Sequence, residues 1–271
     1  MLIGVIVQKS TQRQIHNLHF QGIADQCDSA VVKNITDKLI SFSGVEGYCV
    51  EVGNGYWDSW LMPMLNQTKV VCEKVKKMKE LKDGYNIVGI SQGTLIARGV
   101  VEFCDGGPPV KNFISISGPH AGTTLVPLCK HLAPSGYLKL PDAIPAYLDK
   151  CEFLPLLNNE LPDKRNSTYK ERFSSLQNLV LIMSEEDGVL IPKETAWFGY
   201  YPDGASSPVL PPQQTKLYTE DWIGLRTLDE AGRVKFFSFS GGHVEFSDTD
   251  IKKYVVPYLK DQALTEHSTS K

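Results

Sequence analysis

The fold of this chain is decided by the stretch Gly84-Tyr-Asn-Ile-Val-Gly-Ile-Ser-Gln-Gly93. Its residues 85–90 form a short apolar run that predicts a buried strand, and residues 91–93 predict a tight turn. Residues 94–103 follow with apolar side chains at helical spacing, and residues 110–117 form a second apolar run. A strand, a helix and another strand in this order form a unit with parallel strands. The centre of the chain therefore predicts an α/β fold.

The flanking segments extend this pattern. Residues 67–82 carry apolar side chains three and four positions apart, which predicts an amphipathic helix that ends at Asp83-Gly84. Two further strands are expected at 179–183 and 234–239, and a closing helix at 249–259.

Two other segments, 120–178 and 189–230, are rich in Pro, Asn and Tyr and are expected to leave the sheet. The length is that of one globular domain. We therefore expect a single domain over residues 1–271, with a mostly parallel central sheet, flanking helices and an insertion at about 120–178.

Composition excludes several classes of function. The formal net charge of −3 comes with no basic stripe, so no nucleic-acid partner is expected. No run of about 18 apolar residues occurs, so no transmembrane segment is expected. The apolar start, residues 1–7, turns polar before it reaches the usual length of a signal-peptide core, so an export signal is not evident. No Cys-x-x-Cys pair of the kind found in zinc and redox sites occurs, and we expect neither a metal site nor a cofactor.

Cysteines and glycosylation sequons bear on the compartment. In an exported chain the six cysteines could form disulfides, whereas in a cytosolic chain they would be small core residues. Sequons have meaning only in the secretory pathway, and such tripeptides also arise by chance. The pattern alone leaves both questions open. The cysteines are Cys27, Cys49, Cys72, Cys104, Cys129 and Cys151, and the sequons begin at Asn34, Asn66 and Asn166.

A candidate nucleophile lies in the turn after the first central strand. Gly89-Ile-Ser-Gln-Gly93 matches the pattern G-x-S-x-G, the nucleophile elbow of α/β-hydrolases. The glycines let the backbone turn sharply and expose the serine hydroxyl at a helix N-terminus, which favours negative charge. The alternative is a glycine-rich turn in which Ser91 only caps the helix. The strand–turn–helix context favours Ser91 as a nucleophile within an α/β-hydrolase fold.

A serine nucleophile needs a histidine base and a carboxylate that orients this base. In α/β-hydrolases the acid and then the base follow the serine along the chain. His243 follows the last predicted strand through a glycine-rich loop, whereas the other histidines precede the elbow, lie ahead of any late acid or belong to the polar tail. The acid is expected after the strand at 179–183, where Glu185, Glu186 and Asp187 compete. Asp187 is favoured because it precedes a glycine in a predicted turn.

The oxyanion formed by acyl attack needs two backbone N–H donors. One belongs to the residue after the nucleophile, which is Gln92. The other comes from a loop after an early strand, and Gln21-Gly22-Ile23, which follows apolar residues, supplies Ile23 as the candidate donor. The alternative for this second segment is an ordinary turn.

Several segments carry distinctive residue combinations in addition to 84–93. They are Ile-Ser-Gly-Pro-His-Ala-Gly (116–122), Glu-Thr-Ala-Trp-Phe-Gly-Tyr-Tyr (194–201), Leu-Tyr-Thr-Glu-Asp-Trp-Ile-Gly-Leu (217–225) and Gly-Gly-His (241–243). Together these segments resemble the palmitoyl-protein thioesterase family, in particular its plant-type members, over most of the chain.

The resemblance implies a hydrolase that cleaves the thioester between a long-chain (palmitoyl) acyl group and a cysteine, through an acyl-enzyme on Ser91. Its partners would be S-acylated proteins or peptides and the fatty acyl chain. Asp187 and His243 match the family's acid and base, which decides among the three carboxylates. The resemblance further implies a disulfide between Cys72 and Cys104, glycosylation, and a lysosomal, vacuolar or extracellular location reached through the secretory pathway.

The chain departs from the family's pattern in three places. Gln21-Gly22 stands where the family usually has His-Gly, and residues 1–19 lack the usual signal peptide and differ from the family's first strand. Between Cys129 and His131 the family carries a further stretch that helps build the helical cap and includes a cysteine partner for Cys129. The cap predicted at about 120–178 is therefore shortened.

These departures leave two alternative functions. A carboxylic-ester lipase is one, because a triad does not by itself distinguish sulfur from oxygen leaving groups. An acyl-binding protein with impaired catalysis is the other, because of the shortened cap and Gln21.

Overall fold

A computed structural model of the protein describes residues 3–4, 16–20, 23–125 and 132–260, and within them the chain forms one sheet of seven strands. The strand order is β1-β3-β2-β4-β5-β6-β7, in which β1 is antiparallel to its neighbours and all other pairs are parallel. The mostly parallel α/β sheet expected from the sequence is confirmed. The strands are β1 (Ile3–Gly4), β2 (His16–Phe20), β3 (Gly47–Cys49), β4 (Tyr85–Ile90), β5 (Val110–Ile116), β6 (Asn178–Ser184) and β7 (Val234–Phe239).

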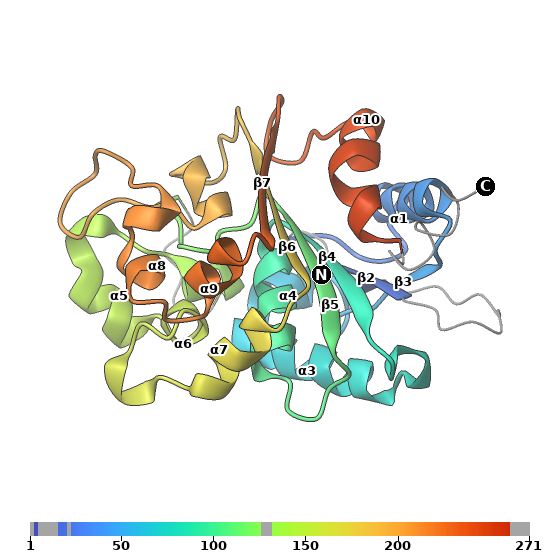
Figure 1. The fold of residues 1–271 in the computed structure, drawn as a ribbon, viewed down its shortest axis with the longest axis horizontal. Coiled ribbons are helices and arrows are strands. Elements are labelled where there is room, and N and C mark those ends of the chain that lie inside the picture. The colour runs from blue at the N-terminus through green and yellow to red at the C-terminus, as the bar shows by residue number, and fades with distance from the viewer. Residues whose placement is uncertain (1–2, 5–15, 21–22, 126–131, 261–271) are drawn as a thin grey trace.

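Helices cover both faces of this sheet (Figure 1). The α-helices are α1 (Ala30–Ser43), α2 (Tyr56–Leu61), α3 (Met64–Lys77), α4 (Gln92–Phe103), α5 (Ile144–Lys150), α6 (Leu154–Leu157), α7 (Ser167–Ser174), α8 (Lys216–Thr219), α9 (Leu225–Glu230) and α10 (Asp248–Asp250). Short 3-10 turns are η1 (Lys79–Leu81), η2 (Ala133–Tyr137), η3 (Pro141–Ala143), η4 (Pro162–Lys164), η5 (Lys193–Trp197), η6 (Pro212–Gln214) and η8 (Val256–Tyr258), and η7 (Ile251–Val255) is a π-helix.

Along the central strands, successive side chains point to opposite faces of the sheet and belong to two separate hydrophobic cores. On β4, Ile87 packs with α3, α4 and the helices between β5 and β6, while Val88 and Ile90 pack with α1 and the C-terminal helical turns. Figure 1 shows α1 and α10 on one side of the sheet and α3 and α4 on the other. Since all six residues of β4 are buried, this strand reads in the sequence as a continuous apolar run.

The segments expected to leave the sheet do so. Residues 120–178 and 189–230, as far as the structure describes them, add short helices but no strand beyond the start of β6. No helix among the described residues is long and apolar enough to cross a membrane.

The closing helix differs from the expectation. Residues 249–259 are helical but not one regular α-helix, because α10, the π-helix η7 and the 3-10 turn η8 follow one another. Pro257 has no N–H to donate and its ring would collide with the carbonyl of Lys253, so a regular α-helix cannot continue through it. A widened π turn directly before the proline accommodates this constraint.

The start of the chain also differs from what the sequence suggested. Residues 1–19 were expected to differ from the family's first strand, yet His16–Phe20 form β2, which lies in parallel between β3 and β4. Leu18 is fully buried there, and His16 and His19 are buried with it. Burial lowers the pKa of His19 to about 3, so this side chain is neutral within the sheet.

Candidate active site

Ser91 lies in the turn between β4 and α4, and its backbone conformation depends on the residues next to it. Ser91 has a φ of +54°, in the left-handed region that residues with a side chain rarely adopt. Its N–H donates to the Ile116 carbonyl (2.9 Å), and its carbonyl accepts from the Thr94 N–H (3.0 Å). A Cβ on Gly89 would lie 2.7 Å from the Thr94 Cα, so only glycine allows the helix to start this close to the strand.

Three side chains that are far apart in the sequence lie in one hydrogen-bonded chain beside this turn. The Ser91 Oγ is 2.8 Å from His243 Nε2, and His243 Nδ1 is 2.7 Å from Asp187 Oδ2. Ser91 follows β4, Asp187 follows β6 and His243 follows β7, so all three lie at the carboxyl edge of the sheet. The structure thus brings together the three residues that the sequence singled out as nucleophile, acid and base.

Electrostatics fixes the direction of these hydrogen bonds. Burial alone would raise the pKa of Asp187, but hydrogen bonds from His243 and from the backbone amides of Leu190 and Val189 outweigh it, and the pKa lies below its ordinary value. An ionised Asp187 can only accept, so His243 Nδ1 donates to it. In the tautomer that carries its proton on Nδ1, Nε2 is an acceptor, and the Ser91 hydroxyl donates to it.

The competing carboxylates lie elsewhere. Glu185 accepts from Ser238 Oγ (2.6 Å), and both Glu185 and Glu186 are exposed at the surface. Of the three carboxylates, Asp187 is the one hydrogen-bonded to His243.

The expected oxyanion donors lie on two segments that meet at α2. Gln92 is the first residue of α4, where the backbone N–H has no acceptor within the helix. Ile23 precedes Ala24, whose N–H donates to Ser59 Oγ at 2.9 Å. The Gln92 side chain donates to the Ser59 carbonyl, also at 2.9 Å. No pattern in the sequence pointed to Ser59, which is fully buried. Gln21 and Gly22 lie outside the described residues.

Two disulfides are present among the described residues. Cys27–Cys49 joins the segment after β2 to the end of β3, a pairing that the sequence left open. The Cys27 N–H also donates to Glu51 Oε2 at 3.3 Å. Cys72–Cys104, the pair expected from the resemblance, joins α3 to the residue after α4.

The other two cysteines do not take part in these bridges. Cys151 is a buried free thiol whose Sγ donates to the Gly136 carbonyl, and burial raises its pKa to about 11, so the thiol stays protonated. Cys129 and His131, where the sequence predicts a shortened cap, lie outside the described residues.

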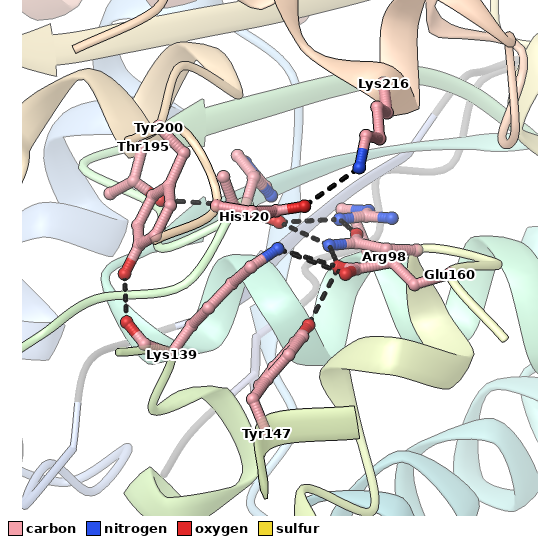
Figure 2. Close-up of polar contacts among 11 residues, drawn as sticks. Arg98, His120, Lys139, Tyr147, Glu160, Thr195, Tyr200 and Lys216 are labelled. Atoms are coloured by element: carbon pink, nitrogen blue, oxygen red, sulfur yellow. Dashed lines mark hydrogen bonds and ion pairs between the residues drawn. The ribbon is translucent and has the colours of Figure 1, made fainter. Parts of the chain in front are cut away.

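A buried polar cluster attaches the segment between β5 and β6 to α4 (Figure 2). Arg98, fully buried on α4, donates to Asn158 Oδ1 at 2.9 Å, and Asn158 Nδ2 donates to Glu160 Oε1 at 2.9 Å. Glu160 also accepts from Lys139 (3.1 Å) and from Tyr147 Oη (2.8 Å). Because buried charges persist only where partners satisfy them, these contacts fix the segment against the helix that begins after Ser91.

Apolar side chains are exposed next to the triad residues in the sequence. Val189, two residues after Asp187, is 51% exposed, and Val244, directly after His243, is 48% exposed. In the parts of the chain that the structure describes, no three His, Cys, Asp or Glu side chains are grouped as metal ligands would be. An exposed apolar side chain therefore lies within two residues of both the acid and the base along the chain.

The geometry of the site agrees with a comparison against protein families. The family model for palmitoyl protein thioesterase matches residues 18–243, a span that begins in β2 and ends at the histidine of the triad arrangement. The chain belongs to the palmitoyl-protein thioesterase family. Membership makes it a thioester-hydrolysing serine hydrolase.

Curated palmitoyl-protein thioesterases align along much of the chain. Palmitoyl-protein thioesterase 3 of Dictyostelium discoideum is 38% identical over 234 residues, which cover 79% of each chain. Palmitoyl-protein thioesterase 1 of Caenorhabditis elegans is 30% identical over 281 aligned residues, covering 91% of this chain and 93% of the relative. Lysosomal thioesterase PPT2-B of Xenopus laevis is 30% identical over 256 residues, covering 82% and 87%.

A solved structure has the same fold. Lipase B of Aspergillus fumigatus superposes with a TM-score of 0.50 at 13% identity, over 87% of this chain and 48% of the lipase. At this level of identity the likeness concerns the α/β-hydrolase fold alone.

Proposed function

We propose that the protein hydrolyses the thioester between a palmitoyl or similar long acyl chain and a cysteine of an S-acylated protein or peptide. The observation that carries this proposal is the hydrogen-bonded chain from Ser91 through His243 to Asp187, with donor-to-acceptor distances of 2.8 and 2.7 Å. In the proposal these residues are the nucleophile, the base and the acid of a catalytic triad.

The first half of the reaction acylates the serine. His243 Nε2 accepts the Ser91 proton while Oγ bonds to the thioester carbonyl carbon, and Asp187 stabilises the imidazolium that forms. The carbonyl oxygen becomes an oxyanion, which accepts hydrogen bonds from the backbone N–H groups of Gln92 and Ile23. The carbon–sulfur bond then breaks, the cysteine sulfur leaves with the proton from His243, and the acyl group remains on Ser91.

The second half removes the acyl group with water. His243 takes a proton from the attacking water, the hydroxyl adds to the ester carbonyl, and Ser91 Oγ leaves with the proton returned by His243. The products are a free fatty acid and the restored serine. A thiol has a pKa of about 8.5, so its anion leaves more readily than an alkoxide does. The first half therefore depends less on protonation of the leaving group when the substrate is a thioester.

We assign the acyl chain to exposed apolar side chains that neighbour the acid and the base along the chain. Val189 and Val244 are exposed beside the acid and the base, and Leu125 is 57% exposed at the start of the segment between β5 and β6. Exposed apolar side chains near a polar site favour an apolar ligand. In this proposal the chain is one domain, and residues from about 120 to 178 form its shortened cap.

An oxidising, acidic compartment fits the chemistry of the chain. Two disulfides are typical of exported or lumenal proteins, and several relatives are named lysosomal thioesterases. The lowered pKa of Asp187 keeps this carboxylate ionised in mildly acidic solution. Of the three sequon asparagines, Asn34 and Asn66 are exposed on helices, while Asn166 is partly buried and caps α7. We propose a lysosomal or vacuolar protein glycosylated at Asn34 and Asn66.

The test is hydrolysis of a palmitoyl-cysteine peptide by the purified chain beside Ser91→Ala. We expect turnover by the wild type and a loss of about a million-fold in kcat in the variant, because triad members act as a unit. A matched palmitoyl oxyester, run in parallel, separates a thioesterase from a carboxylic-ester lipase. A folded wild type that binds palmitate, hydrolyses neither ester and resists a fluorophosphonate probe would be an acyl-binding protein instead.

A further inference from the structure

Ser59, on α2, touches both segments that carry the oxyanion donors. Its Oγ accepts the Ala24 N–H at 2.9 Å, one residue after Ile23. Its carbonyl accepts from the Gln92 side-chain amide, also at 2.9 Å. Ser59 is fully buried, so water does not compete for either contact.

The hydroxyl of Ser59 is oriented as an acceptor toward the segment after β2. It has one proton, which it donates to the Tyr56 carbonyl at 2.6 Å. Its lone pairs are then free for the Ala24 N–H. Ala24 has a φ of +66°, a left-handed conformation that costs a residue with a Cβ about 1–2 kcal/mol. A restraint from outside the segment is needed to hold this backbone, and the Ser59 hydroxyl is such a restraint.

The Gln92 side chain is fixed at both ends. Its Nε2 donates to the Ser59 carbonyl, and its Oε1 accepts from Tyr137 Oη at 2.9 Å. These two contacts hold the Gln92 side chain and so restrain the first residue of α4, whose backbone N–H is the proposed donor. One buried residue therefore bears on the placement of both N–H groups.

We infer that Ser59 is the positioning residue of the oxyanion hole, which sets the direction of the Ile23 amide relative to that of Gln92. This inference rests on the proposed roles of Ile23 and Gln92 in catalysis. It adds a residue that touches neither the substrate nor the triad, and that acts through Ala24 and the Gln92 side chain.

The hydroxyl can be removed without dismantling α2. Gln67 Nε2 donates to the carbonyls of Met62 (2.7 Å) and Ser59 (3.4 Å), and so holds the end of this helix independently of the Ser59 side chain. The Ser59 carbonyl, which receives the Gln92 amide, also remains in Ser59→Ala. That variant therefore removes the link to Ala24 and leaves the link to Gln92.

Ser43→Ala is a matched control. Ser43 is also a buried serine of a helix, and its Oγ accepts a backbone N–H, that of Val45, at 3.1 Å. It lies on α1, away from the triad. Both variants leave one backbone N–H without its acceptor, so both are expected to lose about 1–3 kcal/mol of unfolding free energy.

The experiment measures kcat and KM for a palmitoyl-cysteine peptide, and the inhibition constant of a palmitoyl trifluoromethyl ketone, which forms a tetrahedral oxyanion with the serine. For Ser59→Ala we expect kcat to fall about 10- to 100-fold, less than the roughly 100- to 1,000-fold that loss of a whole donor costs. KM should stay within about twofold, while the ketone binds more weakly by the same factor as kcat/KM falls. Ser43→Ala should match the wild type in all three.

Two results would overturn the inference. One is an unchanged ketone affinity in Ser59→Ala, and the other is an equal loss of activity in Ser59→Ala and Ser43→Ala. If Ser59→Ala does not fold, Ser59→Cys keeps the shape with a weaker acceptor and should give a smaller loss of the same kind. If the wild type does not turn over the thioester, the proposed function fails. The inference is then judged by the rate of fluorophosphonate labelling of Ser91, which should be slower in Ser59→Ala than in Ser43→Ala.

Discussion

The turn after β4 and the segment after β2 lie at the same edge of the sheet, but different kinds of contact hold them. The turn that carries Ser91 is held largely by its own neighbours, because Gly89 lets Thr94 approach and Thr94 bonds back to the Ser91 carbonyl, while the Ser91 N–H bonds to the more distant Ile116 carbonyl. The segment from Ile23 to Cys27 is held by distant residues: Ser59 bonds to Ala24, and Cys49 forms a disulfide with Cys27.

This difference decides which contacts can be predicted from the local sequence and which cannot. A turn stabilised mainly by residues within five positions of one another leaves a motif in the sequence, and the elbow is such a motif. A segment stabilised by residues 22 to 35 positions away leaves none, because each partner looks ordinary in its own surroundings. The two halves of the proposed site should therefore respond differently to mutation.

The largest effect is expected within the triad. Asp187→Asn removes the acceptor that sets the tautomer of His243, and kcat should fall about 10,000-fold with the unfolding midpoint little changed. The controls are Glu185→Gln and Glu186→Gln, which change the other two carboxylates of the same loop and should keep wild-type kcat. If kcat fell in either control as much as in Asp187→Asn, Asp187 would not be the acid of the triad.

The next effect tests the local side of the comparison. In Gly89→Ala, the new Cβ would meet the Thr94 Cα at 2.7 Å and its backbone nitrogen at 3.0 Å, so strand and helix must separate. We expect about 1–3 kcal/mol of lost stability and about a 100-fold loss in kcat/KM, since a shift of about 1 Å displaces the nucleophile. Gly188→Ala, where a Cβ meets nothing within 4 Å, is the control. Equal activity of the two variants would show that the elbow tolerates a side chain.

A smaller effect tests the distant side. Replacing Cys27 and Cys49 together by serine should lower kcat/KM about 10-fold, equal to about 1.4 kcal/mol in the barrier, because the Ser59 contact remains. Replacing Cys72 and Cys104 together should leave kcat/KM unchanged. Each pair should cost about 2–4 kcal/mol of unfolding free energy, so both are assayed well below their unfolding midpoints. The comparison fails if the two pairs lower activity alike.

The smallest effect on activity is expected for Glu102 on α4, the helix that begins at the elbow, where the change concerns stability. Burial raises the pKa of Glu102 from 4.5 to about 7, although Arg98, 2.9 Å away, opposes this. Between these two values the folded state binds the proton more tightly than the unfolded state does. This group therefore makes stability fall as pH rises, by up to about 1.4 kcal/mol per pH unit. Glu102→Gln should flatten the decline in unfolding free energy between pH 5 and about 7, and an unchanged decline would refute the assignment.

The sequence predicted the elements that are stabilised by their own residues. The bounds of β4 and β7 are those expected, because both are short apolar runs between turn residues. The closing helix at 249–259 was also predicted, but its division into α10, η7 and η8 was not, because the apolar spacing does not show how Pro257 changes the helical hydrogen bonds. Three of the site's residues, Ser91, His243 and Asp187, were named in advance, the last by resemblance.

The remaining features depended on contacts across the fold. Cys27–Cys49 could not be chosen among the alternatives, because its geometry exists only once β2 and β3 pair. Ser59 and the Tyr137 hydroxyl, which together hold the Gln92 side chain, belong to a short helix and a 3-10 turn with no distinctive pattern. Hydrogen-bond partners of this kind are defined only when the fold brings distant segments together.

The central claim is that Ser91 carries the acyl group during turnover. The most direct measurement is a rapid acid quench of the wild type with palmitoyl-cysteine peptide, followed by mass spectrometry of the digested protein. The account predicts one palmitoyl ester on the peptide that contains Ser91, formed and lost at rates compatible with kcat. Turnover without acyl-Ser91, or with the acyl group on another residue such as Cys151, would contradict it.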